Sequence, residues 1–312
     1  MTKVACIGCG TVGSAWAVVF ARAGHDVVLF DQNPNIIDDF SIPLIRQTLK
    51  LLNMSRSDVK SDEDILRKIT AVSSLEKAVC DANYVQESIV EDLDQKRVLF
   101  RDLGSLTKIN TILASSTSAI KGSEFLLDIK HPDRALIAHP VNPPSLIPLV
   151  ELCGSPETAP ETLAKVEAFL SQAQMKPITL RKEIDGFILN RLQYTLVAEA
   201  MHLVGEGYCS AADVDRVITE GLALRWAFIG PFEVAHLNST DGFKGFVDQL
   251  GPMMRHMGTS AKTDYQWPDS LAADIHEQLC ASTPVLQISE RQQWRNTQIL
   301  ETRKMQARGK GD

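Results

Sequence analysis

The segment at residues 8–13 reads Gly8-Cys9-Gly10-Thr11-Val12-Gly13. An apolar run over residues 3–7 precedes it and predicts a buried strand, and a helical pattern over residues 12–23 follows it. In a G-x-G-x-x-G turn, the first glycine permits a tight turn, the second lets a pyrophosphate approach the backbone, and the third lets the helix pack closely on the sheet. Free N–H groups at the start of the helix, at Thr11 and Val12, favour negative charge. The segment therefore predicts a dinucleotide phosphate site.

The second predicted strand supports the same interpretation and indicates which dinucleotide binds. It covers residues 26–30 and ends at Asp31. An acidic residue at this point binds the adenosine ribose hydroxyls and repels a 2′-phosphate, and Gln32 follows it instead of an arginine that could hold that phosphate. The sequence therefore predicts NAD as the cofactor, not NADP. The alternative is a glycine turn with a surface aspartate, but strand, loop, helix, strand and Asp31 all occur in the expected order.

Composition excludes several classes of protein. The 312 residues are 44% hydrophobic and 23% charged, which is ordinary for a globular chain and excludes a disordered or fibrous one. A formal net charge of -7 argues against a nucleic-acid partner. No apolar run reaches the roughly 18 residues that a membrane span requires. The first residues lack the apolar core of a secretory signal, so we expect a cytosolic protein without membrane attachment.

The six cysteines are scattered, which is typical of a reducing compartment and not of a disulfide scaffold. Cys6 and Cys9 form a C-x-x-C pair, but Cys6 lies inside a predicted buried strand, where a reactive thiolate is disfavoured. The glycines around Cys9 are better explained by the phosphate site. Because no Cys/His cluster has zinc-ligand spacing, we predict no metal.

Two regions of different character follow one another along the chain. Up to about residue 180, strands are expected near 82–86, 111–114, 135–138 and 176–180, and helices near 34–52, 92–103 and 157–173. This alternation predicts an α/β fold with a doubly wound, Rossmann-like parallel sheet covered on both faces. Beyond residue 181 the apolar positions follow a helical period. We therefore predict an NAD-binding domain over residues 1–181 and an all-helical domain over residues 182–312.

A histidine and a glutamate form a candidate acid–base pair. His139 lies at the carboxyl end of a predicted strand and is followed by prolines, at the edge where α/β sheets bind ligands. Glu151 ends the apolar run 148–150. A carboxylate bonded to a histidine fixes its tautomer and raises its basicity. Taken singly, a structural histidine and a solvated glutamate are the ordinary alternatives.

These residues belong to a longer series of segments: the glycine loop, Ser115-Ser116-Thr117-Ser118, and residues 138–144, 148–152, 185–194, 224–231 and 291–295. In this order, over nearly the whole chain, they resemble the 3-hydroxyacyl-CoA dehydrogenase family. Within the family the likeness is greatest to the branch of lambda-crystallin and L-gulonate 3-dehydrogenase.

The resemblance implies roles for individual residues. His139 would be the general base that takes the proton from the substrate's 3-hydroxyl, with Glu151 as its partner. Ser118 and Asn190 would hydrogen-bond the reacting oxygen or position the substrate. Because Asn190 falls in the predicted helical domain, the site is expected in a groove between the domains. Three further residues match family positions near the nicotinamide and its ribose: Glu91, Lys96 and Asn142.

The family likeness further implies NAD-dependent oxidation of a small 3-hydroxy acid, with L-gulonate giving 3-dehydro-L-gulonate. A 3-hydroxyacyl-CoA such as 3-hydroxybutyryl-CoA, 3-hydroxybutyrate and a carnitine-like compound stay open as substrates. A crystallin-like structural protein without activity is the alternative of another class, and the intact set of Ser118, His139, Glu151 and Asn190 argues against it. The spacing of Glu91 and Lys96 alone fits an ordinary charged helix turn equally well.

The helical domain is expected to bind substrate and to form a homodimer. Arg225 lies in the mostly apolar stretch 222–231, where an arginine requires an anionic partner. That partner is either the free carboxylate of the substrate, held by two parallel hydrogen bonds, or a structural neighbour such as Glu220 or Glu233. Trp226 and Phe228 either line the pocket or belong to the core. An apolar stripe is either a dimer contact or internal core; it consists of Phe243, Phe246, Val247 and Leu250.

Overall fold

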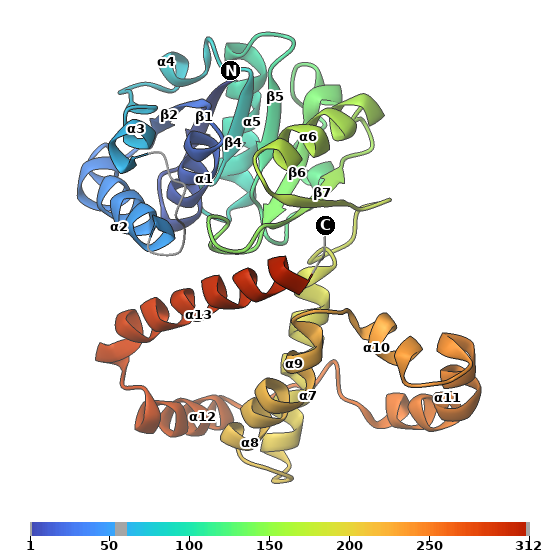
Figure 1. The fold of residues 1–312 in the computed structure, drawn as a ribbon. Coiled ribbons are helices and arrows are strands. Elements are labelled where there is room, and N and C mark those ends of the chain that lie inside the picture. Colours follow the sequence, from blue (N-terminus) through green and yellow to red (C-terminus); the bar gives the residue numbers. More distant parts are fainter. Residues whose placement is uncertain (1, 54–60, 310–312) are drawn as a thin grey trace. The chain divides into compact units, whose positions relative to one another are not determined.

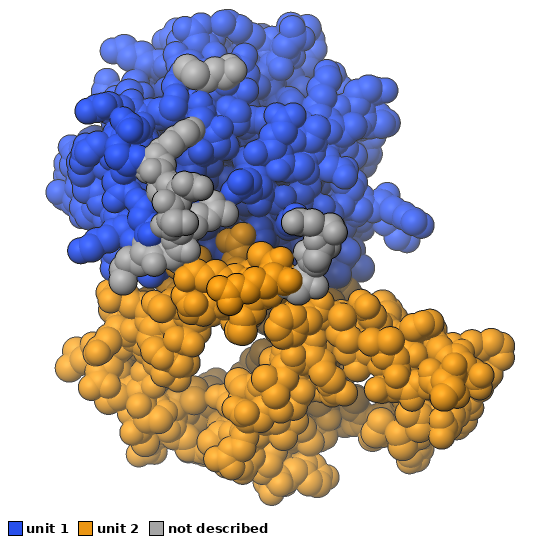
Figure 2. Space-filling model, in the orientation of Figure 1, with its two compact units in different colours: residues 1–190 blue, residues 191–312 orange. Residues whose placement is uncertain are grey.

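The computed structural model describes residues 2–53 and 61–309, which form two compact units, Met1–Asn190 and Arg191–Asp312 (Figures 1 and 2). The first unit contains the sheet and the second is helical, so the predicted α/β fold with a helical C-terminal part is confirmed. The sequence prediction placed the division slightly earlier, between residues 181 and 182.

The first unit is built on one eight-stranded sheet with the order β3-β2-β1-β4-β5-β6-β7-β8. The strands are β1 (Lys3–Ile7), β2 (Asp26–Phe30), β3 (Ile69–Ala71), β4 (Tyr84–Glu87), β5 (Ile112–Ser115), β6 (Ala135–Pro140), β7 (Leu149–Gly154) and β8 (Lys176–Thr179). Neighbouring strands are parallel except β6 and β7, which are antiparallel. The predicted parallel sheet is thus present, and this pair is its exception. The connection over residues 141–148 is too short for a crossover, which requires about a dozen residues or more.

Helices cover both faces of this sheet. They are α1 (Thr11–Arg22), α2 (Ile42–Asn53), α3 (Asp62–Leu66), α4 (Leu75–Val79), α5 (Leu93–Leu106) and α6 (Pro160–Gln172). On one face, aromatic rings of α1, β4 and α6 pack together: Trp16, Phe20, Tyr84 and Phe169. On the other face, Phe100 and Leu103 of α5 join a buried cluster with side chains of β1, β4, β5 and β6.

The helix predicted over residues 34–52 is present with a local change of winding. A π-helical turn at Ile37–Ser41 continues directly into α2. Pro43, which has no N–H for a helix hydrogen bond, lies just after that turn. The proline therefore alters the winding of the helix without breaking it.

The second unit consists of helices with few buried side chains. Its helices are α7 (Leu189–Gly205), which begins inside the first unit, α8 (Ala211–Arg216), α9 (Ala223–Trp226), α10 (Pro231–Leu237), α11 (Gly242–Ser260), α12 (Asp269–Ser282) and α13 (Ile288–Gly309). Helix α10 packs against α11, and α8 packs against α12. Its buried apolar side chains are Ala198, Ala211, Ala235, Leu271 and Leu300. Along the described parts of the whole chain, no helix has both the length and the apolar character that crossing a membrane requires.

Candidate active site

Most of the predicted site residues come from one edge of the sheet. Strands β1 and β4 are neighbours although they are far apart in the sequence, so the strand order reverses between them. In open α/β sheets, ligands bind beside such a reversal, at the carboxyl ends of the strands. The loops after β1, β2, β4 and β5 and the end of β6 carry the polar residues described below.

The glycine loop after β1 has the geometry that a pyrophosphate site requires. Gly8 has a φ of +88°, a left-handed conformation that favours glycine, and its N–H donates to the Phe30 carbonyl at 2.9 Å. A Cβ on Gly13 would lie 1.9 Å from the Gly8 carbonyl oxygen, so α1 can approach the loop only with glycine there. A Cβ on Gly10 would meet no atom within 4 Å. This space beside the backbone, at the start of α1, fits a phosphate group.

Asp31 connects this loop to the end of β2. Its Oδ2 accepts a hydrogen bond from the Cys9 N–H at 2.7 Å, and its Oδ1 accepts one from the Asn33 N–H at 2.9 Å. Nearby segments that follow β2 and β3 line a cleft of about 440 Å³, formed by Pro34, Ile37, Asp38, Ala71, Val72, Ser73 and Lys77. The glycine loop, Asp31 and this cleft together fit the adenosine and pyrophosphate parts of NAD.

The C-x-x-C pair begins in β1 with Cys6 and ends in this loop with Cys9, and both thiols are unreactive. The side chains of Cys6 and Cys9 are both fully buried. Burial raises the pKa of the Cys9 thiol to about 12, with the Asp31 carboxylate adding to the effect, and burial also raises the pKa of Cys6. Both thiols are therefore protonated at neutral pH, which disfavours redox chemistry.

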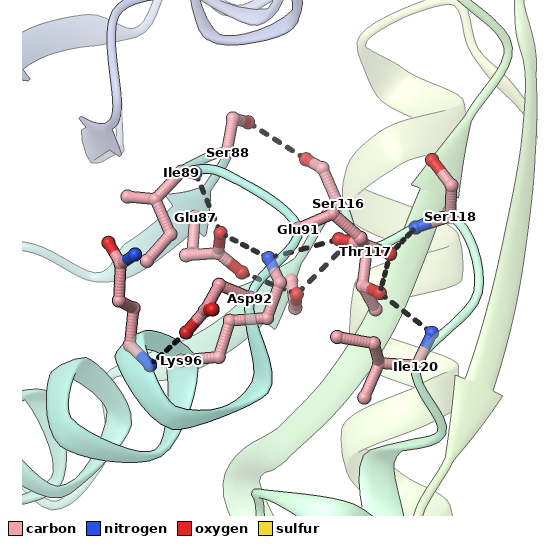
Figure 3. Close-up of polar contacts among 12 residues, drawn as sticks. Glu87, Ser88, Ile89, Glu91, Asp92, Lys96, Ser116, Thr117, Ser118 and Ile120 are labelled. Atoms are coloured by element: carbon pink, nitrogen blue, oxygen red, sulfur yellow. Dashed lines mark hydrogen bonds and ion pairs between the residues drawn. The ribbon is translucent and has the colours of Figure 1, made fainter.

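A second polar cluster occupies the carboxyl ends of β4 and β5 (Figure 3). The Lys96 side chain on α5 is only 1% exposed, and its Nζ lies 2.8 Å from Glu87 Oε1 and 3.4 Å from Glu91 Oε2. An ordinary charged helix turn would leave this lysine in solvent. The structure instead holds the ammonium between two carboxylates, of which Glu87 is fully buried and Glu91 is 39% exposed.

Glu91 fastens the loop after β5. Its Oε1 accepts hydrogen bonds from the Thr117 hydroxyl at 2.5 Å, the Ser118 N–H at 2.8 Å and the Ala119 N–H at 3.0 Å. Burial by itself raises the pKa of this carboxyl. The Thr117 hydroxyl, the Lys96 ammonium and the two amides together lower it by more, so the net pKa lies below its ordinary value. Glu91 is thus held as a carboxylate at the edge of the sheet.

His139 and Glu151 lie directly opposite each other on the antiparallel strands β6 and β7. His139 Nδ1 is 2.8 Å from Glu151 Oε2, and both side chains are buried. The histidine ring also packs against Phe187, with the ring centroids 5.2 Å apart. The structure therefore brings the two predicted residues together in a dry environment.

The start of α7 holds the second oxygen of this glutamate. Glu151 Oε1 accepts hydrogen bonds from the Ile188 N–H at 2.9 Å and the Leu189 N–H at 3.0 Å. The preceding Gly186 and Phe187 have positive φ values of 72° and 51°. Such values are strained for a phenylalanine and are kept only where packing enforces them. They turn the chain so that the buried Phe187 ring lies against His139 and the free amides of α7 reach Glu151.

Asn190 and Ser118 also meet, through the main chain of the serine. The Asn190 Nδ2 group donates to the Ser118 carbonyl at 2.8 Å. Asn190 is the last residue of the first unit, although the sequence prediction assigned it to the helical domain. The first turn of α7 is bonded to β7 through Glu151, which explains this placement. Asn142 is exposed in the connection between β6 and β7.

The predictions for the second unit have a different outcome. Arg225 is exposed, so the premise of an arginine in an apolar interior is wrong, and within the described residues it forms no ion pair with Glu220 or Glu233. Trp226 and Phe228 are 40% and 55% exposed and thus are not core residues. In the stripe on α11, no side chain is buried: Phe243 is exposed, and Phe246, Val247 and Leu250 are half-buried.

Sequence reasoning missed several polar residues at this edge. Glu87 is fully buried, and the signal was the polar pair Gln86–Glu87 at the end of an otherwise apolar strand, since buried charges require partners. Ser116 is another, because its Oγ is the acceptor for Trp16 Nε1 at 3.1 Å and for Gln86 Nε2 at 2.8 Å. Nothing in a run of serines indicates which of them would be used in this way.

A glycine loop beside a strand-order reversal, an acidic residue after β2 and a histidine–glutamate pair near the same edge define a class, the NAD-dependent oxidoreductases. Comparison with known proteins places the chain within that class: it belongs to the 3-hydroxyacyl-CoA dehydrogenase family. The family model for the NAD binding domain matches residues 3–184, and the model for the C-terminal domain matches residues 186–280. NAD is thus its cofactor, and the predicted family and enzyme class are confirmed.

Individual relatives agree with this assignment. The chain is 39% identical to the lambda-crystallin homolog of Bos taurus over 94% of its length and 92% of that protein. It is 36% identical to the L-carnitine dehydrogenase of Oceanobacillus iheyensis, with 82% of each chain covered. The crystal structure of 5-formyl-3-hydroxy-2-methylpyridine 4-carboxylic acid 5-dehydrogenase superposes with a TM-score of 0.81 over 98% of this chain and 99% of that chain. At 24% identity, that likeness concerns the fold alone.

Proposed function

We propose that this chain oxidises the 3-hydroxyl group of a small, free 3-hydroxy acid, with L-gulonate as the first candidate and 3-dehydro-L-gulonate as the product. The observation that carries the proposal is the buried contact of 2.8 Å between His139 and Glu151. The 39% identity to a lambda-crystallin homolog over nearly the whole chain supports the choice of branch.

The histidine supplies the proton chemistry. An ionised carboxylate only accepts hydrogen bonds, so Glu151 fixes the tautomer in which His139 Nδ1 carries the proton. Nε2 is then the acceptor for the proton of the substrate hydroxyl, and the carboxylate stabilises the imidazolium that forms. Bound NAD supplies the acceptor for the hydride that leaves C3, the carbon that carries this hydroxyl. The amides of Ile188 and Leu189 hold Glu151 in place throughout.

The loop after β5 positions the substrate. Glu91 binds the Ser118 N–H and Asn190 binds the Ser118 carbonyl, so the main chain of this serine is fixed on both sides. The Ser118 hydroxyl points away from Glu91 (Figure 3) and serves as a donor to the reacting oxygen. We assign Glu91, Lys96 and Asn142 to the side of the nicotinamide and its ribose, as the family resemblance implies. Arg225 is exposed and forms no ion pair with Glu220 or Glu233 among the described residues, so we assign its guanidinium to the carboxylate of the free acid.

A carnitine-type substrate is the second candidate. The L-carnitine dehydrogenase of Oceanobacillus iheyensis is 36% identical over 256 residues of alignment. L-Carnitine is also a small 3-hydroxy acid with a free carboxylate, so the same histidine, glutamate and arginine would act on it. A 3-hydroxyacyl-CoA differs because a thioester takes the place of that carboxylate.

Steady-state assays with NAD distinguish these substrates. We expect the highest kcat/KM with L-gulonate, compared with L-carnitine and 3-hydroxybutyryl-CoA, when NADH formation is followed. Arg225→Ala should lower kcat/KM for the free acids about tenfold or more, because one charge-assisted pair is lost. It should change kcat/KM for the CoA thioester little. Arg255→Ala, an exposed arginine of the same unit, is the control. Preference for the thioester in the unmodified protein would overturn the free-acid proposal.

Replacement of the base tests the mechanism itself. His139→Ala should leave NAD affinity nearly unchanged and reduce kcat by about 10²–10⁴-fold, the usual range for a general base. Equal activity would remove His139 from the mechanism. If the unmodified protein binds NAD but oxidises none of the 3-hydroxy compounds, a structural role like that of a crystallin gains support.

The second unit is proposed to carry the dimer contact. Its buried side chains are few, whereas large apolar side chains such as Phe232, at 77% exposed, and Leu286, at 98% exposed, face solvent in the single chain. Apolar surface of this extent is typical of a subunit interface. We therefore propose a homodimer. From the composition of the sequence we further propose that it is cytosolic and has no nucleic-acid or membrane partner.

A further inference from the structure

Glu87 is a fully buried carboxylate to which the proposed mechanism gives no role. It lies at the carboxyl end of β4, beside the Lys96 ammonium (Figure 3), and its side chain accepts three hydrogen bonds. Oε1 accepts from the Ile89 N–H at 2.7 Å and from Lys96 Nζ at 2.8 Å, and Oε2 accepts from the Ser115 hydroxyl at 2.5 Å. An ionised carboxylate without such donors would not be stable in this interior.

The distances show how one cation is shared between two anions. Lys96 Nζ is closer to Glu87, at 2.8 Å, than to Glu91, at 3.4 Å. A buried ammonium requires an anionic partner, and Glu87 meets this requirement with its Oε1. Glu91 is then not drawn fully onto the lysine, and its Oε1 remains available for the Thr117 hydroxyl and the Ser118 amide.

We propose that Glu87 is a positioning residue for the reaction: by holding the Lys96 ammonium, it leaves Glu91 free to fix the loop over residues 117–119 beside the cofactor. This inference rests on the proposed function, in which Glu91 and Ser118 act at the nicotinamide and the substrate. Glu87 touches neither of these molecules and acts through Lys96.

Removing the charge of Glu87 should disturb that loop. In Glu87→Gln the size of the side chain is kept, but Glu91 becomes the carboxylate that balances Lys96. The attraction draws Glu91 towards the ammonium and away from the amides of Ser118 and Ala119. The loop over residues 117–119 then loses the hydrogen bonds that hold it at the edge where the cofactor binds.

Two measurements report the loosening of this loop without requiring any substrate. In Glu87→Gln we expect the dissociation constant for NAD to rise about tenfold or more, the effect of one charge-assisted hydrogen bond. Hydrogen exchange at the amides of Ser118 and Ala119 should become faster. Asp81→Asn is the matched control, because Asp81 is paired with Lys108 at the same distance of 2.8 Å but on the surface, and it should change neither quantity.

A second variant tests whether Glu87 acts through the lysine. Glu87→Gln combined with Lys96→Gln leaves no unpaired charge in the interior, so it remains informative if the single variant does not fold. The neutral pair should restore slow exchange at Ser118 and Ala119, because no cation then competes for Glu91. Fast exchange in the double variant, or unchanged exchange and NAD binding in Glu87→Gln, would overturn the proposal. Failure of the proposed substrate would leave these readouts interpretable, since none requires turnover.

Discussion

At the scale of single residues, Gly10 and Gly13 separate the requirements of the fold from those of the cofactor. Gly10 has an extended backbone, with a φ of -70°, and open space beside it, so alanine fits there without strain. We expect Gly10→Ala to change the free energy of unfolding by less than about 0.5 kcal/mol. Its methyl group would occupy the place of the pyrophosphate, so NAD affinity should fall about tenfold or more.

Gly13→Ala is the counterpart of that prediction. Its Cβ would lie 1.9 Å from the Gly8 carbonyl oxygen, a backbone atom that cannot rotate away as a flexible side chain could. The helix must move away, and a loss of stability of about 1–3 kcal/mol is expected. Urea unfolding and NAD titration of both variants check the pair. If Gly10→Ala binds NAD as tightly as the unmodified protein, the pyrophosphate does not lie against this loop.

Glu91 predicts how stability depends on pH. The folded protein lowers the pKa of this carboxyl, so its contribution to stability is present above the unfolded pKa of about 4.3 and disappears as the pH falls through the folded pKa. Glu91→Gln should therefore be less stable than the unmodified protein at about pH 7, and the difference should narrow at about pH 3. Urea unfolding at both pH values measures it, with the exposed Glu157→Gln as control. A difference that stays constant with pH would contradict the assignment.

The residues that sequence reasoning found and missed differ in a physical way. His139 was found because a polar side chain at the end of an apolar strand is conspicuous, and Glu151 because it ends an apolar run. Their contact depends on strand register, which pairs them directly across β6 and β7 and is not written in either segment alone. The burial of Glu87 and Lys96 was harder to predict from the sequence, because the neighbours that the fold supplies decide whether a charge can be buried.

At the scale of elements, the α5 helix depends on a buried arginine. Arg134 is 4% exposed and donates to groups around the carboxyl end of α5 and the following turn: the carbonyls of Gly104, Lys108 and Thr111 and the Thr107 hydroxyl. A lysine lacks the planar fork that reaches these acceptors together. We expect Arg134→Lys to lower the free energy of unfolding by about 2–4 kcal/mol, because buried carbonyls lose their donors.

The control for this variant lies on the same helix. Arg101 is exposed on α5, and Arg101→Lys should leave stability within about 0.5 kcal/mol of the unmodified protein. Circular dichroism during urea unfolding gives both values. Equal stability of Arg134→Lys and Arg101→Lys would mean that the acceptors around α5 find other donors. The prediction that α5 depends on Arg134 would then be wrong.

The elements that were predicted are those whose local pattern is strong. The strands near residues 3–7 and 26–30 and the helix after the glycine loop follow from apolar runs and glycine positions. Strand β3 was missed because it has three residues at the edge of the sheet. Strand β7 was recognised only as an apolar run, because its pairing with β6 decides that it is a strand, and pairing depends on tertiary context.

At the scale of the whole molecule, the second unit leaves many of its large apolar side chains exposed. The sequence could not decide whether the stripe on α11 is internal core or a dimer contact. In the single chain Phe243 is 41% exposed, and Val247 and Leu250 are only half-buried. A core within this unit would bury these side chains, and the proposed dimer would cover them with a second copy of the chain.

This reasoning predicts the behaviour of the protein in solution. The purified chain should sediment as a dimer, and its unfolding midpoint should rise with protein concentration, because dissociation accompanies unfolding. Val247→Asp places a charge in the stripe on α11 and should weaken the dimer about tenfold or more, since an unpaired carboxylate would be buried. Gln249→Asp, exposed on the same helix, should leave the dimer intact. A monomeric mass at every concentration, with a midpoint that does not depend on concentration, would show that the exposed stripe has no partner copy.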